Sequence, residues 1–233
     1  MKTTYLCIGD VHAPFIDKKV FRILSEKIPE HYEDALSRGR RFCVIQLGDL
    51  YDMYSASKYV RSLDLITPQD EFELGKETAR ERWGIIRKRA KKASCYQLLG
   101  NHDARPFKRL LEKCPELASV VSFKDLFTFE GVKTIHDPAQ ELILDEIVFM
   151  HGYRSKLGDH CLYNRLSTVC GHSHRGGVLF FPHGKEMLFE LNAGYIAQSD
   201  SVPMRYGMQR ISKTTHGYGL IDQDGPRFIP IVK

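Results

Sequence analysis

The chain has 233 residues, of which 42% are hydrophobic and 11% aromatic, so it can supply a sizeable core and is not intrinsically disordered. We expect one domain over residues 1–233. The net charge of +5 is a mild excess that does not by itself establish a nucleic-acid partner. No apolar run approaches the roughly 20 residues that span a bilayer, and Met1–Asp10 lacks the features of a secretory signal. We therefore expect no membrane association and a cytoplasmic location.

The cysteines are scattered and form no CxxC pair. Four of them lie inside apolar, strand-like runs, where a free cysteine behaves as a small hydrophobic residue. We interpret the cysteines as reduced core residues: Cys7, Cys43, Cys95, Cys114, Cys161 and Cys170.

Two kinds of segment alternate in the first half of the chain. Short apolar runs bounded by Gly-Asp or Gly-Asn predict buried strands at Thr4–Ile8, Phe42–Leu47 and Cys95–Leu99. Helical spacing or composition predicts helices around Val20–Ile28, over Phe72–Lys92 and over Pro106–Lys113. This alternation is typical of parallel strands joined by crossover helices.

After about Val120 the pattern changes to strands and tight turns. The predicted strands are Glu141–Met150, Thr168–Cys170, Val178–Phe181, Glu186–Leu191 and Tyr218–Ile221. Gly-rich and Asp-Gly turns separate several of them. We expect an α/β domain with two sheets facing each other and helices outside.

Five predicted strands end in glycine next to a carboxylate, amide or imidazole. The segments are Gly9–His12, Gly48–Asp52, Gly100–Asp103, His151-Gly152 and Gly171–His174. Ligands of open α/β sheets bind at the carboxyl ends of the strands, so these side chains can converge on one place. Glycine permits the sharp turns that direct them there.

The donor types in these segments indicate a metal site. Two Asp, one Asn and four His form a mixed oxygen and nitrogen set that suits Mn, Fe or Zn better than Ca or Mg. Seven side chains are too many for one tetrahedral ion, whereas two ions that share a carboxylate use the set fully. Such a pair of ions stabilises in-line displacement at phosphorus.

The five segments, in this order, resemble the calcineurin-like metallophosphoesterase superfamily, whose pattern is GDxH, GDxxD, GNH[DE], a lone His and GHxH. The resemblance covers residues 9 to 174 and implies a four-layer αββα sandwich of two mixed β-sheets with a binuclear centre. It implies a first metal held by Asp10, His12, Asp49 and His174, with Asp49 bridging. Asn101, His151 and His172 then complete the second metal. Manganese is the favoured ion, with iron, zinc or nickel as alternatives.

The resemblance also implies catalytic roles. A water shared by two cations would be deprotonated near neutral pH and would act as nucleophile. His102 matches the general acid that protonates the leaving oxygen. Asp52 matches the acid that orients this histidine, and Asp103 is a second candidate for that partner.

The substrate class is less well determined by the sequence. Segment 76–92 holds eight basic and two acidic residues, which indicates either a face for a polyanion or a solvated helix. Met53 stands where the phosphoprotein phosphatase branch has an Arg. We expect a phosphodiesterase for nucleic acid or nucleotides, similar to repair nucleases and small prokaryotic or phage members; a phage-encoded chain would act in the host cytoplasm. The alternatives are a phosphomonoesterase for a nucleotide, phosphoprotein or metabolite, and a metal-stabilised scaffold without turnover.

Candidate substrate-binding residues are Arg105, Arg175 and Tyr51. Tyr51, Tyr54 and Tyr59 could stack on bases or pack under a loop. Segment Ser199–Thr215 contains several cations and could return over the site. The remaining histidines are interpreted as ordinary residues, and His160 is expected in a loop because no apolar strand precedes it.

Overall fold

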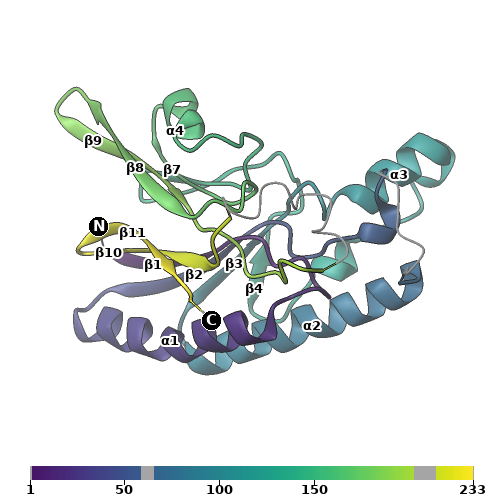
Figure 1. The fold of residues 1–233 in the computed structure, drawn as a ribbon, viewed down its shortest axis with the longest axis horizontal. Coiled ribbons are helices and arrows are strands. Elements are labelled where there is room, and N and C mark those ends of the chain that lie inside the picture. The colour runs from purple at the N-terminus through teal and green to yellow at the C-terminus, as the bar shows by residue number, and fades with distance from the viewer. Residues whose placement is uncertain (1, 59–65, 202–213, 233) are drawn as a thin grey trace.

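A computed structural model of the chain describes residues 2–58, 66–201 and 214–232. A six-stranded sheet has the order β11-β10-β1-β2-β3-β4 (Figure 1). Strands β1 to β4 are parallel, whereas β10 is antiparallel to β1 and β11 is antiparallel to β10. The bounds are β1 (Thr3–Ile8), β2 (Arg41–Leu47), β3 (Ser94–Leu98), β4 (Val132–Thr134), β10 (Gly217–Asp222) and β11 (Gly225–Pro230).

A second, five-stranded sheet has the order β5-β6-β7-β9-β8. Its central strands β6, β7 and β9 are parallel, and the edge strands β5 and β8 are antiparallel to their neighbours. The bounds are β5 (Leu142–Leu144), β6 (Ile147–Phe149), β7 (Ser167–Cys170), β8 (Gly177–His183) and β9 (Glu186–Asn192).

Side chains that alternate between the two faces of the first sheet contribute to two separate hydrophobic cores. Tyr5 and Cys7 belong to the apolar cluster that also contains Phe149 of the second sheet, and the rings of Tyr5 and Phe149 are 5.0 Å apart. Leu6 and Ile8 point the other way, into the cluster under the helices. Because successive side chains of a strand point to opposite faces, one buried strand can join both cores.

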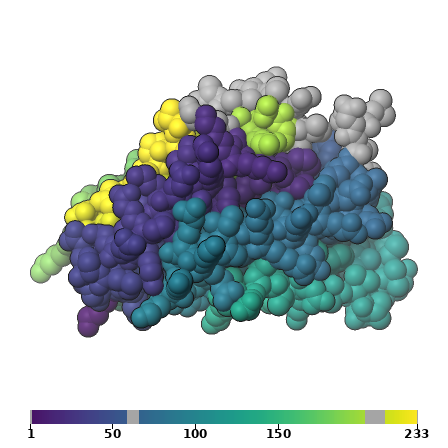
Figure 2. Space-filling model, turned by 90° about the horizontal axis from the view of Figure 1, so that it is seen from below, coloured from purple at the N-terminus to yellow at the C-terminus, as the bar shows by residue number. Residues whose placement is uncertain are grey.

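Helices α1 (Lys18–Ser37) and α2 (Pro68–Arg89) lie side by side along the outer face of the first sheet (Figures 1 and 2). α1 begins after Asp17, whose carboxylate accepts hydrogen bonds from the Lys19 and Val20 N–H groups. α3 (Arg105–Lys113) follows β3, and α4 (Asp159–Asn164) packs against β7 and β9 of the second sheet. Single 3-10 turns occupy Tyr54–Ala56, Pro115–Leu117 and Lys124–Phe127.

None of the helices in the described ranges combines the length and the apolar character that crossing a bilayer requires.

The strands and helices predicted for the first half are confirmed, with ends that shift by at most four residues, except that α1 continues nine residues beyond the predicted Ile28, to Ser37. The prediction of a single strand over Glu141–Met150 is wrong, because Asp145 and Glu146 have φ angles of 47° and 61° and form a turn between β5 and β6. Among the α-helices and strands of the described residues, β4, β11 and α4 were not predicted. β4 and α4 are too short to show a period, and prolines at Pro226 and Pro230 hide β11.

The prediction that cysteines are core residues is confirmed for the four in strand-like runs. Cys7, Cys43, Cys95 and Cys170 are free and buried in β1, β2, β3 and β7. Cys161 is also buried, on α4, and Cys114 is half-buried.

Candidate metal centre

The seven predicted donors come together where strands of both sheets end. Asp10, Asp49 and Asn101 follow β1, β2 and β3 of the first sheet, whereas His151 and His172 follow β6 and β7 of the second. His12 and His174 lie two residues beyond Asp10 and His172 on the same loops. The site therefore spans the carboxyl edges of the two sheets, as the sequence predicts.

The first group of donors is Asp10, His12 and His174. Nε2 of His12 lies 3.2 Å from Nε2 of His174, and Nε2 of His174 lies 3.6 Å from Asp10 Oδ1. Side-chain atoms of all three residues lie within 4.8 Å of one another. This spacing is compatible with a shared cation.

The second group is Asn101, His151 and His172. Nε2 of His151 is 2.9 Å from Asn101 Oδ1 and 3.3 Å from His172 Nδ1, and Asn101 Oδ1 is 3.0 Å from His172 Nδ1. His151 is buried, His172 is half-buried and Asn101 is exposed. This group therefore faces solvent on the side of Asn101.

Asp49 lies between the two groups. Its Oδ2 atom is 3.3 Å from His151 Nε2 and 4.0 Å from His12 Nε2. Its Oδ1 atom accepts a hydrogen bond of 2.8 Å from the His102 N–H group. The side chain is only 2% exposed, so its charge has little access to water. Asp49 is thus placed to contribute to both groups.

Hydrogen bonding defines the tautomer of His151. Its Nδ1 atom is 3.0 Å from the carbonyl oxygen of Leu47, which can only accept, so Nδ1 carries the hydrogen. In the neutral ring, Nε2 then presents a lone pair toward Asp49, Asn101 and His172. Acceptor atoms that converge in this way are stabilised by positive charge between them, which either a proton on the imidazole or a metal ion can supply.

The pKa values of His151 and Asp49 are shifted because their side chains lie close together in a buried site. Burial alone would lower the pKa of His151, but the charge of Asp49 and its hydrogen bond raise it to about 9. Burial would raise the pKa of Asp49, yet the charges of His151 and His102 hold it well below its ordinary value. Without a metal, protons on the imidazoles balance the carboxylates.

Unusual backbone conformations direct four of the donors into the site. His12, Asp49, His172 and His174 have φ angles of 51°, 47°, 66° and 58°, in the left-handed region that L-residues rarely occupy. Such residues persist only where the surrounding structure holds them, and they cluster at functional sites.

A cluster beside the donors contains the predicted catalytic residues. Oδ2 of Asp52 is 3.0 Å from His12 Nδ1 and 3.5 Å from His102 Nδ1, and Arg105 Nη1 donates to Asp52 Oδ1 at 3.1 Å. Burial would raise the pKa of Asp52, but its contacts with His102 and His12 lower it below its ordinary value. Asp52 therefore stays charged between the two imidazoles.

Asp103, the second candidate partner of His102, has another role. Its carboxylate accepts hydrogen bonds from the backbone N–H groups of Leu50, Tyr51 and Gly100, at 3.2, 2.9 and 2.8 Å. Asp103 therefore joins the loops after β2 and β3. Of the two candidates, the structure places Asp52 against the His102 ring.

Arg105 reaches the other side of the His102 ring, where its Nη2 atom is 2.9 Å from Nε2. Burial lowers the pKa of His102, although the charge of Asp49 opposes this effect. Arg105 also borders a small pocket with Asn101. The residue predicted to bind substrate is thus in contact with the predicted general acid.

The interpretation of Tyr51 as a substrate-binding residue is wrong. Tyr51 is 1% exposed, and its hydroxyl donates to the Leu126 carbonyl oxygen at 2.6 Å, so the alternative of a packing residue holds. Tyr54 is buried as well. Arg175 is half-buried with Nη1 at 3.5 Å from the Ser155 carbonyl oxygen, and its role stays a prediction. Tyr59 and residues 202–213 of the segment Ser199–Thr215 lie outside the described residues.

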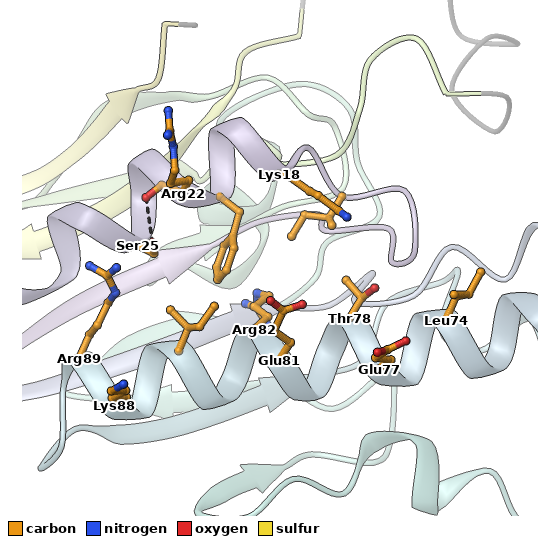
Figure 3. A pocket seen from close by; sticks show the side chains of 13 residues that line it. Lys18, Arg22, Ser25, Leu74, Glu77, Thr78, Glu81, Arg82, Lys88 and Arg89 are labelled. Atoms are coloured by element: carbon orange, nitrogen blue, oxygen red, sulfur yellow. Dashed lines mark hydrogen bonds between the residues drawn. The ribbon is translucent and has the colours of Figure 1, made fainter.

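The basic segment 76–92 is not beside the donors. Arg82 is 1% exposed and donates to the Gln46 side chain. Arg89 ends α2 shortly before β3 begins at Ser94, so this end lies at the amino edge of the sheet, opposite the site. A groove of about 780 Å³ lies between α1 and α2, and Lys88, Arg89, Glu77 and Glu81 are among the residues that line it. Figure 3 shows these side chains.

Sequence reasoning missed Gln46, which lies buried in β2. Its Nε2 atom donates to the carbonyl oxygens of Gly9 and Gly48, at 2.8 and 2.9 Å. These glycines directly precede Asp10 and Asp49, so Gln46 ties together the ends of the two donor-bearing strands. A lone amide within the apolar run Phe42–Leu47 is the signal that could have identified it.

His160 was expected in a loop, but it lies buried on α4. Its Nε2 atom accepts hydrogen bonds from the N–H groups of Tyr153 and Arg154, at 3.1 and 3.2 Å, and its Nδ1 atom is 3.4 Å from Glu190 Oε1. His160 therefore supports the loop that follows His151. Sequence reasoning missed this role because α4 has only six residues.

No family model matches this chain, and no curated protein matches it either.

Close packing of glycine against Asp49 yields a test of the site's rigidity. A Cβ atom on Gly100 would overlap Oδ1 and the backbone nitrogen of Asp49, so Gly100→Ala should lower the free energy of unfolding by about 1–3 kcal/mol. Gly84→Ala is the control, because open space surrounds Gly84 on α2 and alanine favours the helix. Urea unfolding measures both, and equal stability of the two variants would contradict the packing at Asp49.

Proposed function

We propose that the chain is a metal-dependent phosphoesterase with a binuclear centre, acting on phosphodiester bonds of nucleic acid or nucleotides. The observation that carries the proposal is the position of Asp49, between two groups of donors whose lone pairs converge. The order of the motifs resembles calcineurin-like metallophosphoesterases. Two mixed sheets with helices also accord with the four-layer αββα sandwich which that resemblance implies.

We propose that the donors divide between two ions. Asp10, His12 and His174 would hold one ion, Asn101, His151 and His172 the other, and Asp49 would contribute to both. When bound, divalent ions such as manganese would supply Lewis acidity and a nucleophile from water near neutral pH.

His102, Asp52 and Arg105 would protonate the leaving group and bind the substrate phosphate. The Asp52 carboxylate near Nδ1 of His102 favours the tautomer in which Nδ1 is protonated, and it stabilises the positively charged ring. His102 would then donate a proton through Nε2 to the leaving oxygen. Arg105 lies against the same nitrogen, so it would bind a substrate phosphate oxygen in place of this contact.

Metal content tests the centre directly. Calorimetric titration with Mn²⁺ should give two ions per chain, and binding should tighten as the pH rises towards 9, because metal displaces the proton that His151 holds below its pKa. Asp49→Asn should weaken the binding of both ions. The loss of affinity should exceed the roughly 10–100-fold that is typical when a residue hydrogen-bonded to a metal ligand is replaced. Asp125→Asn is the control, because it removes an exposed carboxylate that belongs to neither donor group. A stoichiometry of one or none would exclude a binuclear centre.

Substrate preference tests the reaction class. With Mn²⁺, the protein should hydrolyse bis(p-nitrophenyl) phosphate faster than p-nitrophenyl phosphate, measured as kcat/KM from nitrophenolate release. The reverse preference would identify a phosphomonoesterase. Two bound ions without turnover of either ester would identify a scaffold.

The general-acid role predicts a dependence on the leaving group. His102→Ala should lower kcat by about 10²–10⁴-fold on a diester with a poor alkoxide leaving group, because protonation is then needed. The loss should be much smaller with nitrophenolate, and metal content should be unchanged. His183→Ala, an exposed histidine of β8, is the control. An equal loss on both leaving groups would refute the assignment.

A further inference from the structure

A small basic pocket adjoins the candidate centre on the side of α3. Its volume is about 260 Å³, and Asn101 and Arg105 border it together with Lys58, Lys108, Arg109 and Glu112. Asn101 belongs to the second donor group, and Arg105 contacts His102. The pocket is therefore continuous with the place where the reacting phosphate would lie.

The helix periodicity explains why cations face this pocket. Arg105, Lys108, Arg109 and Glu112 follow one another at intervals of three, one and three residues, which places them on one face of α3. Lys58 adds a further cation from the segment after β2. Among the described residues, the lining thus holds four basic side chains and one carboxylate.

The contacts of these cations show which of them remain for a ligand. Arg105 is bound to Asp52, and Arg109 Nη1 is 3.8 Å from Glu112 Oε2 in an exposed pair that water screens. Among the described residues, no carboxylate lies within ion-pair distance of Lys108, which is exposed. Lys108 and Arg109 can therefore turn to an anion with little loss.

The size of the pocket limits what it can hold. Pockets for whole small-molecule ligands are about 300–1,000 Å³, so one of about 260 Å³ suits a single group of a larger molecule. Its charge selects an anionic group, and its position beside Asn101 requires a group joined to the reacting phosphate. A second phosphate of the same substrate meets all three requirements.

We propose that the α3 pocket binds a second phosphate of the substrate, so that the enzyme prefers phosphoesters that carry two or more phosphates. Oligonucleotides and nucleoside polyphosphates share this chemistry. The proposal rests on the proposed function for the location of the reacting phosphate. It differs from the earlier expectation for segment 76–92, because the cations belong to another helix at the opposite edge of the sheet.

The test compares two substrates that differ by one phosphate. These are the p-nitrophenyl ester of thymidine 5′-phosphate, with and without a 3′-phosphate. The parent protein should favour the 3′-phosphorylated ester in kcat/KM. The double variant Lys108→Ala with Arg109→Ala should lose at least tenfold on that ester, equivalent to about 1.4 kcal/mol, and should change little on the other.

A charge-matched control keeps the net charge equal. Lys91→Ala with Lys92→Ala also removes two exposed cations, but just beyond α2 at the opposite edge of the sheet, so it should keep the preference. If both double variants lose activity alike, long-range charge explains the effect and the pocket is refuted. A parent with no preference for the second phosphate would overturn the proposal as well.

Direct binding separates this proposal from the proposed function. Thymidine 3′,5′-bisphosphate should bind the parent more tightly than thymidine 5′-phosphate in calorimetry, and Lys108→Ala with Arg109→Ala should abolish the difference. Equal binding of the two nucleotides would refute the subsite even in an active enzyme. Turnover of bis(p-nitrophenyl) phosphate, which has one phosphate, tests the phosphoesterase function alone.

Two competitors distinguish the sources of the second phosphate. A thymidine tetranucleotide and ADP, each with excess Mn²⁺, are compared as inhibitors. Stronger inhibition by the tetranucleotide, with a salt slope that falls by about 0.7 for each contact removed at Lys108 or Arg109, assigns the pocket to a nucleic-acid strand. Stronger inhibition by ADP assigns the pocket to a nucleoside polyphosphate. If the Lys108→Ala, Arg109→Ala variant is inhibited by both competitors as strongly as the parent, the proposed second-phosphate pocket is overturned.

Discussion

The organisation of the molecule at the strand ends depends on one buried charge, the carboxylate of Asp49. It is 2% exposed and faces imidazole nitrogens of both His12 and His151. A carboxylate in this setting is stable only with positive charge close by, because desolvation of an unpaired ion is very costly. Protons on the histidines can supply that charge, and so can metal ions. The raised pKa of His151 has the same cause, the negative charge of Asp49 beside it.

Holding these acceptors together has a conformational cost that the surrounding polar groups offset. Left-handed backbone at four donors costs on the order of 1–3 kcal/mol each, and persists only if neighbouring interactions hold it. Gln46 binds the carbonyl groups before Asp10 and Asp49, and Asn192 donates to the Gly171 carbonyl oxygen at 2.6 Å. Asp103 fixes the loops after β2 and β3. Buried hydrogen bonds around the site thus keep the donors in place before any ion binds.

The sequence alone was sufficient to predict that these side chains lie close together, because their segments adjoin a glycine at the end of a short apolar strand, and strand ends meet at one edge of a sheet. It was not sufficient to choose between Asp52 and Asp103, which both lie in donor-bearing segments. That choice depends on how the turns after β2 and β3 pack, with Asp103 turned to backbone N–H groups and Asp52 to imidazoles. Tyr51 was misjudged for a similar reason, since spacing does not show that its hydroxyl meets Leu126. α4 and β4 were too short for any period to show.

Charge is the feature for which position along the chain misleads most. A crossover helix runs antiparallel to the strands it joins, so its first turn lies near the carboxyl edge of the sheet and its last turn near the amino edge. The cations of α2 are concentrated in its last turn, at Arg87, Lys88 and Arg89, which carries them away from the donors. Helix α3 begins four residues after Asn101, so its basic face starts at the site itself. The net charge of a segment therefore says little about substrate binding until the direction of its helix is known. Here the direction of the helices places the few cations of α3 near the donors and the more numerous cations of segment 76–92 away from them.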